Sequence, residues 1–371
     1  MTVAKLAQRI ARRLAECEIR VVFAESCTAG LVSGALSRVP GISSWHCGSA
    51  VTYRNATKAG WLDVDARDLE HPGPVSETVA RQMAVGVLRN TPEADLAMSI
   101  TGHLGPHAPP RLDGRIFLGA ARREPGDVIQ PLHVVDLTLQ ASTRLARQKE
   151  AVAALLESLE KRLEIESRQL NQILPAEDWH ALRDGALDAV CAGDAAEDDR
   201  HTSGLIFPGA FNPAHEGHRQ MAEIAAQLTG ATVEFEISVD NVDKPPLGRY
   251  SATHRVAQML PHGAVWVTRA PTFAEKALLF PGATFLVGAD TMLRIADPSY
   301  YDGDPGQRDG CIETLAEQEC RFLFFGRTID GVFRTIDTMQ LPKALRALCE
   351  EAPPERFRVD VCSTDLRNRD A

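Results

Sequence analysis

The stretch LIFPGAFNPAHEGH, residues 205–218, decides the fold of the second half of the chain. Its first four residues are typical of a buried strand, a turn rich in Gly, Asn and Pro follows, and a helix is predicted over His215–Leu228. His215 and His218 are three residues apart, so their side chains share one face of that helix. Gly209 lets a backbone or a ligand come close. Two imidazoles beside a helix N-terminus suit the phosphates of a nucleotide.

Two other interpretations of this histidine pair remain open on the residues alone. An isolated pair at this spacing is usually two histidines on a helix surface, and a zinc site would need two further ligands, which are not evident in the sequence. The preceding turn, with Gly209, Phe211 and Pro213, favours the phosphate site over both. We predict no metal site from these residues.

The rest of the second half alternates short apolar runs with helical patterns, which is typical of an α/β domain. We therefore predict one domain over residues 203–371, and no internal repeat relates it to the first half. Its strands are predicted at residues 205–208, 233–239, 265–268, 284–287, 322–325 and 358–361.

The first half shows the same alternation over residues 1–165, which predicts a second α/β layered domain. Ser76 is the expected N-cap of one of its helices. Between the two domains we predict a helical and acidic linker, residues 166–202, because its last part packs four acids into eight residues. The predicted strands are 20–24, 48–53, 96–101, 115–121 and 132–137, and the predicted helices are 28–38, 76–89 and 143–162.

The length and charge agree with this division and exclude one class of partner. At about 150 residues per domain, a chain of 371 residues should form two domains and a linker. Lys plus Arg number 40 and Asp plus Glu 50, so the net charge is −10. A nucleic-acid-binding surface must neutralise many phosphates. We therefore predict no nucleic-acid partner.

Neither a membrane segment nor secretion is expected. The longest uncharged apolar stretch, around residues 277–289, is about a dozen residues long, and a bilayer span needs ~20. The N-terminal apolar residues recur at helical spacing with arginines between them, which indicates an amphipathic surface helix and not a signal peptide. Eight cysteines include no C-x-x-C pair. This usage predicts a cytoplasmic protein without a disulfide framework.

The segment Ala24–Gly30 joins a predicted strand to a predicted helix and contains Ser26, Cys27 and Thr28. Free N–H groups at such a helix N-terminus can hold an anion or stabilise an oxyanion during acyl transfer. On this fragment alone, helix capping by Ser26 or Thr28 is the more usual role. Cys27 is a rival nucleophile by position, although no histidine is close to it in the sequence.

Five motifs occur in order in the first half: ESCTAGL (25–31), VPG (39–41), VTYRNATK (51–58), GPVSE (73–77) and TGHLGP (101–106). Over about residues 3–163 the chain therefore resembles the CinA C-terminal family, whose enzymatic members are nicotinamide-nucleotide amidohydrolases. The resemblance implies hydrolysis of nicotinamide mononucleotide to nicotinate mononucleotide and ammonia. It implies no cofactor for this domain, and it implies a homo-oligomer.

The resemblance also assigns roles to residues. Ser26 matches the nucleophile, Lys58 the lysine that activates it, and Tyr53 a neighbouring hydroxyl. A serine nucleophile needs an adjacent base, and a desolvated lysine can be that base, although a lysine taken in isolation is usually solvated on the surface. The matched substrate-binding residues are Thr28, Gly30, Thr101 and Arg144, the last of which would pair with the substrate phosphate.

Two positions depart from the family pattern. The loop of residues 104–110 is rich in proline where many relatives are rich in glycine, and Ala29 stands where many have a second glycine. We expect a stiffer and bulkier loop to narrow the pocket or to abolish turnover.

In the second half, VGADT (287–291), FLFFGR (322–327) and CSTDLR (362–367) accompany the histidine turn. Over about residues 203–371 the chain resembles the nucleotidyltransferase superfamily, which includes the nicotinate and nicotinamide mononucleotide adenylyltransferases. This resemblance implies a Rossmann-like fold with a mainly parallel sheet. It also implies attack by a mononucleotide phosphate on the α-phosphate of ATP, with release of pyrophosphate and with Mg²⁺ entering with ATP.

Roles follow from this second resemblance too. His215 and His218 would hold triphosphate oxygens as the catalytic residues. Asp290 would contact a nucleoside, although a buried capping role is nearly as common. The matched nucleotide-binding residues are Gly209, Phe211, Asp290, Ser363, Thr364 and Arg367.

Together the two resemblances imply a bifunctional enzyme of NAD biosynthesis or salvage, whose two steps are consecutive. Its expected ligands are small nucleotides: nicotinamide or nicotinate mononucleotide and ATP. Two alternatives remain. One is a nucleotide-binding sensor or assembly protein in which one or both sites have lost catalysis. The altered loop of residues 104–110 suggests this, and so do the four residues that follow Arg367, which can form at most a short helical turn behind the phosphate motif. The other is a nucleotidyltransferase that acts on a different phosphorylated acceptor.

Overall fold

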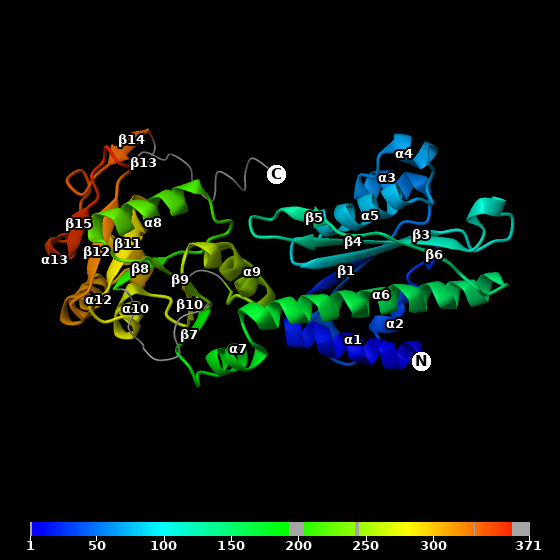
Figure 1. The fold of residues 1–371 in the computed structure, drawn as a ribbon, viewed down its shortest axis with the longest axis horizontal. Helices are drawn as coiled ribbons and strands as arrows, with labels where there is room; N and C mark the ends of the chain where they lie inside the picture. The colour runs from blue at the N-terminus through cyan, green and yellow to red at the C-terminus, as the bar shows by residue number, and fades with distance from the viewer. Residues whose placement is uncertain (1, 193–203, 242–244, 330, 358–371) are drawn as a thin grey trace. The chain divides into compact units, whose positions relative to one another are not determined.

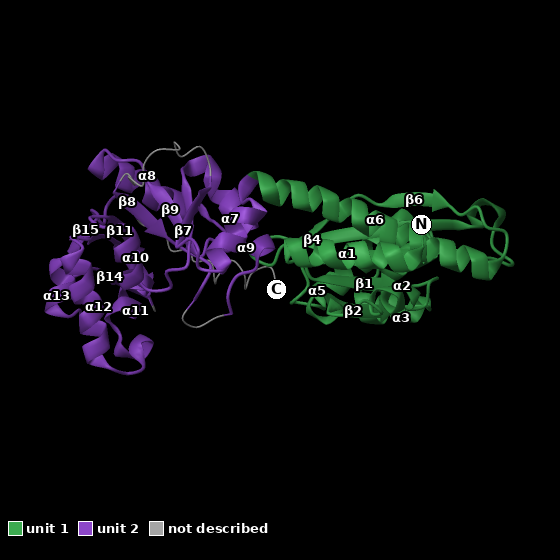
Figure 2. Cartoon of the chain, turned by 90° about the horizontal axis from the view of Figure 1, so that it is seen from below, with its two compact units in different colours: residues 1–172 green, residues 173–371 purple. Residues whose placement is uncertain are grey.

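The computed structural model describes residues 2–192, 204–241, 245–329 and 331–357. The chain divides into two compact units, residues 1–172 and residues 173–371 (Figure 2). Both units are α/β, as predicted, and each has one main sheet.

Unit 1 has a six-stranded sheet in the order β2-β1-β3-β4-β5, with β6 paired to β4. The first three strands are mutually parallel, and β4 runs antiparallel to β3. All five residues of β1 are buried, as expected of a central strand that is covered on both faces. The strands are β1 Val21–Glu25, β2 His46–Val51, β3 Leu96–Gly102, β4 Arg115–Arg123, β5 Ile129–Pro131 and β6 Val135–Thr138.

Helices cover both faces of this sheet (Figure 1). On one side, α1 Val3–Cys17 buries its apolar stripe and pairs Arg9 with Glu160 of α6 Arg144–Ile173. This confirms the predicted amphipathic surface helix. On the other side, α5 Glu77–Arg89 begins at the predicted cap, where Ser76 Oγ accepts from Val79 N (3.4 Å). The smaller helices are α2 Leu31–Leu36, α3 Asn55–Leu62 and α4 Ala66–Glu70.

One predicted helix of unit 1 is shorter than expected. The pattern predicts residues 28–38, whereas α2 begins at Leu31. Ala29 and Gly30 have φ of 54° and 89°, and this left-handed backbone cannot belong to a right-handed helix. The residues before α2 therefore form a turn.

Unit 2 has a seven-stranded sheet in the order β15-β12-β11-β8-β9-β10-β7. Its strands are parallel except β7, which pairs antiparallel with β10. This confirms the mainly parallel sheet. The strand predicted at residues 358–361 lies outside the described residues. The strands are β7 Ala189–Ala192, β8 Leu205–Pro208, β9 Glu234–Ser238, β10 Val265–Thr268, β11 Thr284–Gly288, β12 Arg321–Phe325 and β15 Cys349–Glu351, and β13 Arg327–Ile329 pairs with β14 Val332–Arg334.

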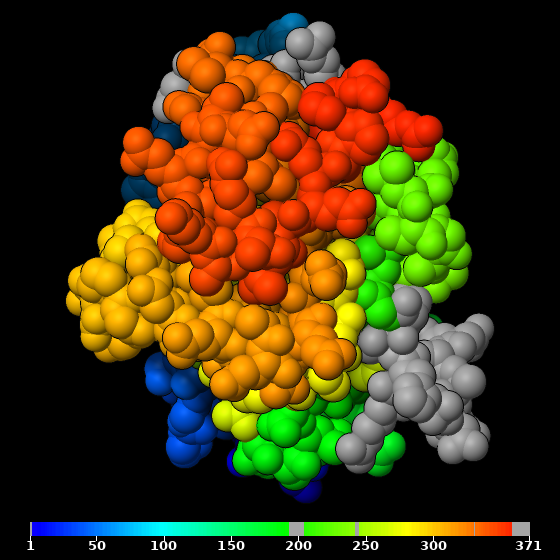
Figure 3. All heavy atoms as spheres, turned by 90° about the vertical axis from the view of Figure 1, so that its left-hand side faces the viewer, coloured from blue at the N-terminus to red at the C-terminus, as the bar shows by residue number. Residues whose placement is uncertain are grey.

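Two apolar cores lie on opposite faces of this sheet. Successive strand residues point to opposite faces, and Leu286 belongs to one core while Phe285 and Val287 belong to the other. Figure 3 shows the outer surface of the segment from α11 to β15, in yellow-orange to red. The helices are α7 Ala176–Arg183, α8 Glu216–Thr229, α9 Arg249–Met259, α10 Phe273–Leu279, α11 Ala289–Ala296, α12 Pro305–Glu317 and α13 Lys343–Ala347.

The segment expected to be a linker, residues 166–202, has regular structure over most of its described length. Residues up to Ile173 continue α6, α7 follows, and β7 forms the edge of the second sheet. Trp179 and Leu182 are fully buried in a core of unit 2, because an amphipathic helix must bury its apolar side. The boundary between the units therefore lies at residue 172 or 173 and not at 165 and 203. No helix in the described ranges is both long enough and apolar enough to cross a membrane.

Candidate functional site

In unit 1, three hydroxyl side chains lie at the carboxyl edge of the parallel strands. Ser26 follows β1 and donates its N–H to Ile100 O (3.0 Å), and Thr52 follows β2 and donates its N–H to Glu25 O (2.8 Å). Because Ile100 pairs with Glu25, Thr101 of β3 is the neighbour of Ser26. All three residues are buried. The carboxyl edge of a parallel sheet is the usual position of ligand sites in α/β proteins.

Lys58 of α3 reaches this edge and is buried, with 2% of its surface exposed. Its Nζ donates to Pro74 O (3.0 Å) and to Thr101 Oγ1 (2.9 Å), and the Thr101 hydroxyl donates in turn to Pro74 O (2.7 Å). Neither acceptor carries a charge. Burial therefore lowers the pKa of Lys58 to about 8, since a desolvated ammonium without a carboxylate is disfavoured. The structure thus places Lys58 inside the protein, and not on the surface where isolated lysines usually lie.

The described residues contain no hydrogen bond between Ser26 Oγ and Lys58 Nζ. The two side chains share Thr101 as a neighbour, and the positive charge of Lys58 also acts on Cys27, the residue after Ser26. Burial nevertheless raises the pKa of the Cys27 thiol to about 12. A thiol must ionise to attack, so burial disfavours Cys27 as a nucleophile.

The expected anion site at the N-terminus of α2 is already filled by a residue of the protein. The buried Glu25 carboxylate accepts from Gly30 N (3.0 Å), Val32 N (3.0 Å) and Ser33 N (2.9 Å), and from Ser49 Oγ (3.1 Å). The N–H of Gly30 is therefore already engaged within the protein, and its role in binding substrate stays a prediction. The helix dipole stabilises Glu25 in place of a ligand.

Two buried hydroxyls near this turn have no protein partner. Thr28 Oγ1 and Thr52 Oγ1 are buried and, within the described chain, without a hydrogen bond. Buried hydroxyls normally find a partner. Of the predicted substrate-binding residues, Thr28 thus has a hydroxyl whose hydrogen bond is not made within the described chain.

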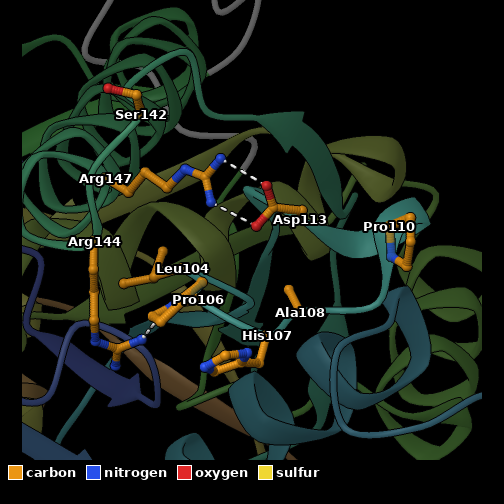
Figure 4. Close-up of a pocket in the computed structure, with 10 residues that line it drawn as sticks. Leu104, Pro106, His107, Ala108, Pro110, Asp113, Ser142, Arg144 and Arg147 are labelled. Atoms are coloured by element: carbon orange, nitrogen blue, oxygen red, sulfur yellow. Dashed lines mark hydrogen bonds and ion pairs between the residues drawn. The ribbon is translucent and has the colours of Figure 1, made fainter.

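Tyr53 and Arg144 form a second group that lies closer to solvent. Arg144 donates from Nη2 to Tyr53 Oη (2.8 Å) and from Nη1 to Gly105 O (2.6 Å), and Tyr53 is 55% exposed. Arg144 also lines a pocket of about 390 Å³. Ser26 and Lys58 do not line this pocket, so the structure separates the predicted residues into an inner and an outer group. The pocket is lined by Leu104, Gly105, Pro106, His107, Ala108, Pro110, Asp113, Ser142, Arg144 and Arg147 (Figure 4).

In unit 2, the histidine turn joins β8 to α8 as predicted. The rings of His215 and His218 stack with centroids 3.7 Å apart, and His215 N donates to His218 Nδ1 (3.2 Å). Burial lowers the pKa of His218 to about 3, and burial together with Arg327 lowers the pKa of His215. Both rings are therefore neutral near pH 7. His215 Nδ1 is buried and has no partner in the described chain.

Gly209 and Phe211 have a structural relationship that the motif alone does not reveal. A Cβ on Gly209 would lie 2.7 Å from Cζ of Phe211, whose ring is buried. Gly209 is thus required by the packing of Phe211. Neither residue gives a direct sign of contact with a ligand.

Asp290, in the first turn of α11, forms an ion pair with Arg327 Nη1 (2.5 Å). Its side chain is 44% exposed, so it is not a buried capping residue. Arg327 Nε, like His215 Nδ1, is buried and unpartnered within the described chain, and the positive charge of Arg327 helps to lower the pKa of His215. The structure thus brings Asp290, Arg327 and the histidines into one region. The phosphate motif with Ser363, Thr364 and Arg367 lies outside the described residues.

Comparison with known protein families agrees with this division. Residues 3–163 match the family model of the CinA C-terminal domain, and residues 206–369 match that of the cytidylyltransferase-like family. The chain joins a CinA C-terminal domain to a cytidylyltransferase-like domain.

Individual relatives match the CinA domain. A CinA-like protein of Chlorobium limicola is 44% identical over 101 residues, which are 27% of this chain and 23% of that protein. A CinA-like protein of Syntrophotalea carbinolica is 39% identical over 115 residues, or 30% and 28% of the two chains. The chain thus spans about a quarter of the length of the curated relatives it matches. The crystal structure of the competence/damage inducible protein CihA from Agrobacterium tumefaciens is 30% identical, with a TM-score of 0.40 over 44% of this chain and 95% of that one.

Two residues of the CinA domain acquire importance only in the structure. Glu25 is the first residue of the ESCTAGL motif, but the motif does not show its four hydrogen bonds, which depend on the turn conformation at residues 29 and 30. The pKa of His103 is lowered, mainly by burial and then by the positive charge of Lys58, while the negative charge of Asp113 acts in the opposite direction. The pKa of His103 therefore depends on one residue of the inner group and on one that lines the pocket. In the sequence, His103 could have been recognised as a candidate site residue by its position, two residues after Thr101 and directly after β3.

No group of three or more possible metal-ligating side chains occurs among the residues described in either domain.

Proposed function

We propose that the CinA domain hydrolyses the amide of nicotinamide mononucleotide to give nicotinate mononucleotide and ammonia. The observation that supports this most strongly is the buried Lys58, whose ammonium has only neutral acceptors and whose pKa is lowered to about 8. A lysine of that kind can lose its proton near neutral pH and act as a general base. Ser26 lies beside Thr101, the hydroxyl that accepts from Lys58 Nζ, because the Ser26 N–H donates to Ile100 O.

The reaction would proceed in two steps. Neutral Lys58 takes the proton of Ser26 Oγ while Oγ forms a bond to the amide carbon, and the same proton then passes to the departing ammonia. Water next attacks the resulting ester, giving its proton to Lys58, and the proton returns to Ser26 as the carboxylate leaves. Thr28, whose hydroxyl has no partner among the described residues, would contact the substrate, and Arg144 would bind its phosphate.

The test is ammonia release from nicotinamide mononucleotide by the full chain. Ser26→Ala and Lys58→Met should each lower kcat at least ~10³-fold, as expected when a nucleophile or its base is removed. Lys5→Met makes the same change on the exposed side of α1 and should leave the rate unaltered. Release of ammonia at the original rate by Ser26→Ala would exclude this mechanism.

For the cytidylyltransferase-like domain we propose adenylyl transfer from ATP to a pyridine mononucleotide, with release of pyrophosphate. The supporting observation is the neutral, stacked His215 and His218 at the N-terminus of α8, with a free buried nitrogen on His215. Neutral imidazoles can donate to phosphate oxygens, and in-line transfer depends on positioning more than on a protein nucleophile. We expect Mg²⁺ to enter with ATP, coordinated by phosphate oxygens and water.

This second activity is tested by pyrophosphate release from MgATP and nicotinate mononucleotide. His218→Ala should lower kcat by roughly 10²-fold or more, whereas His180→Ala, on the exposed side of α7, should not. Nicotinamide mononucleotide or phosphopantetheine can be offered in place of nicotinate mononucleotide, and a phosphoalcohol can be offered together with CTP. Pyrophosphate release with one of these compounds would identify a different acceptor. Tight nucleotide binding without turnover, unaffected by Ser26→Ala or His218→Ala, would favour the sensor or assembly protein. Self-association and a cytoplasmic location remain predictions.

A further inference from the structure

The pocket of the CinA domain is lined by two arginines of α6, one with neutral hydrogen-bond partners and one paired with a carboxylate. Arg144 has two neutral partners, the carbonyl of Gly105 and the phenol of Tyr53. Arg147 forms a two-pronged pair with Asp113, with Nη1–Oδ1 and Nη2–Oδ2 distances of 2.6 and 2.9 Å (Figure 4). Its Nε donates to Ala141 O (2.8 Å).

A second carboxylate lies close to Arg147. Glu150 accepts from the backbone N–H groups of Gln140 and Ala141, each at 2.9 Å, and its charge acts on Arg147. The charge of Arg147 is therefore fully compensated inside the protein. Within the described chain, Arg144 is left as the pocket cation whose hydrogen-bond partners are both neutral.

The pocket is nevertheless large enough for more than one anionic group. Its volume of about 390 Å³ lies within the range of small-molecule sites, so size alone does not limit the ligand to one phosphate. A second phosphate would approach the Asp113 carboxylate, which also lines the pocket and is 44% exposed, and two negative charges within one pocket repel each other.

We propose that Asp113 is a specificity-determining residue of this pocket: by neutralising Arg147 it restricts the site to ligands with a single phosphate group and rejects diphosphates. The inference rests on the proposed binding of a mononucleotide phosphate by Arg144, and it adds the class of ligand that is refused. The packing around the pair supports a fixed role, because a Cβ on Gly105 would lie 3.1 Å from Arg147 Nη1 and 3.2 Å from Asp113 Oδ1.

Charge reasoning gives opposite expectations for the two partners of the pair. Asp113→Asn frees the fork of Arg147, which is a good donor to phosphate oxygens, so inorganic pyrophosphate should bind about fivefold more tightly and inorganic phosphate should change less. Arg147→Gln leaves the Asp113 carboxylate facing the pocket without its cation, so both probes should bind more weakly. The double variant should bind both approximately as the unmodified protein does, since the charges change together.

The experiment measures direct binding of phosphate and pyrophosphate to the full chain by calorimetry, at constant ionic strength. All variants are made in a His215→Ala/His218→Ala background, so that the second domain does not contribute pyrophosphate binding. Glu77→Gln serves as the matched control, because it removes the carboxylate of another arginine pair, Glu77–Arg81 (2.5 Å) on α5, and should leave both affinities unaltered.

A tighter pyrophosphate complex in Asp113→Asn, together with a weaker phosphate complex in Arg147→Gln, would support the inference. Unchanged pyrophosphate binding in a folded Asp113→Asn variant would overturn it, and if that variant does not fold, unchanged phosphate binding in Arg147→Gln would do so. Because binding is measured without turnover, a failure of the amidase assay remains distinguishable. Absence of phosphate binding to the unmodified protein would contradict the proposed substrate as well.

Discussion

Among the residues that the structure describes, each unit has one buried lysine, and the two lysines have different surroundings. Lys58 of unit 1 donates to a carbonyl and a hydroxyl. Lys276 of unit 2 is similarly buried but donates to the Glu236 carboxylate (2.8 Å) as well as to Ala270 O (2.5 Å). Glu236 also accepts from Thr268 Oγ1 (2.5 Å). The same residue type is thus buried once without a counter-charge and once with one.

The difference bears on the role proposed for Lys58 as a base. A buried ammonium without a carboxylate loses its proton easily, because the neutral form avoids the cost of desolvation. A buried ammonium paired with a carboxylate remains charged, and removing one partner leaves the other as an uncompensated buried charge. Burial of a lysine is therefore no sign of a site in itself, and the charge of its partners decides.

The largest expected effect comes from making the same substitution at both lysines. Lys276→Met should lower the free energy of unfolding of unit 2 by about 3–5 kcal/mol, because Glu236 would stay buried and unpaired. Lys58→Met should leave unit 1 as stable as before or more stable at pH 7, because it removes a charge that burial disfavours. Hydrogen exchange read by mass spectrometry on peptides from each unit measures the two stabilities separately.

The control for this pair of variants is Glu236→Gln/Lys276→Met, which removes both charges and should recover most of the loss. If Lys276→Met alone unfolds no more easily than the unmodified protein, the ion pair contributes nothing and the contrast with Lys58 disappears.

The pH dependence of the proposed amidase reaction gives the next largest effect. In the proposed mechanism Lys58 must be neutral to accept the proton of Ser26, and its pKa is lowered to about 8. Below that pH, kcat/KM for nicotinamide mononucleotide should fall about tenfold per unit, and above it the value should level off. The profile is measured by ammonia release between pH 6 and 9.5. A flat profile across this range would show that Lys58 does not have to lose a proton.

Stability should respond to the same group over a different interval. The pKa of Lys58 is about 8 in the folded chain and near ~10.4 in an unfolded one, so between these values the unfolded chain binds more protons. The stability of unit 1 should therefore rise with pH across that window. In Lys58→Met this rise should be absent.

Much of the arrangement at the sheet edges could be predicted from sequence. The alternation of strands and helices indicated both α/β units, and the turns after β1 and β8 were correctly placed next to Ser26 and His215. Local patterns are sufficient there, because a strand, a turn and a helix follow one another along the chain.

What could not be predicted depends on contacts between distant residues. Lys58 donates to acceptors 16 and 43 positions away, and Lys276 donates to a carboxylate 40 positions away. The local sequence around each lysine therefore does not contain its partner. The filling of the α2 N-terminus by Glu25 depends on the left-handed backbone at Ala29 and Gly30. The expected linker was misjudged for a similar reason, since Trp179 and β7 acquire their role only when the sheet of unit 2 is present.

The smallest expected effect concerns one of the two neutral partners of Lys58. Thr101→Val keeps the shape of the side chain and removes the hydroxyl that accepts from Nζ, while Pro74 O remains. A hydrogen bond to the ammonium favours the charged form, so its loss should lower the midpoint of the pH–rate profile by about half a unit, within the range of one hydrogen bond to a charged group. The midpoint is read from the same ammonia assay. At saturating substrate the rate is kcat, so a change in substrate affinity does not move this midpoint. A midpoint that moves upward would mean that Thr101 does not stabilise the ammonium, and that burial alone gives Lys58 its character.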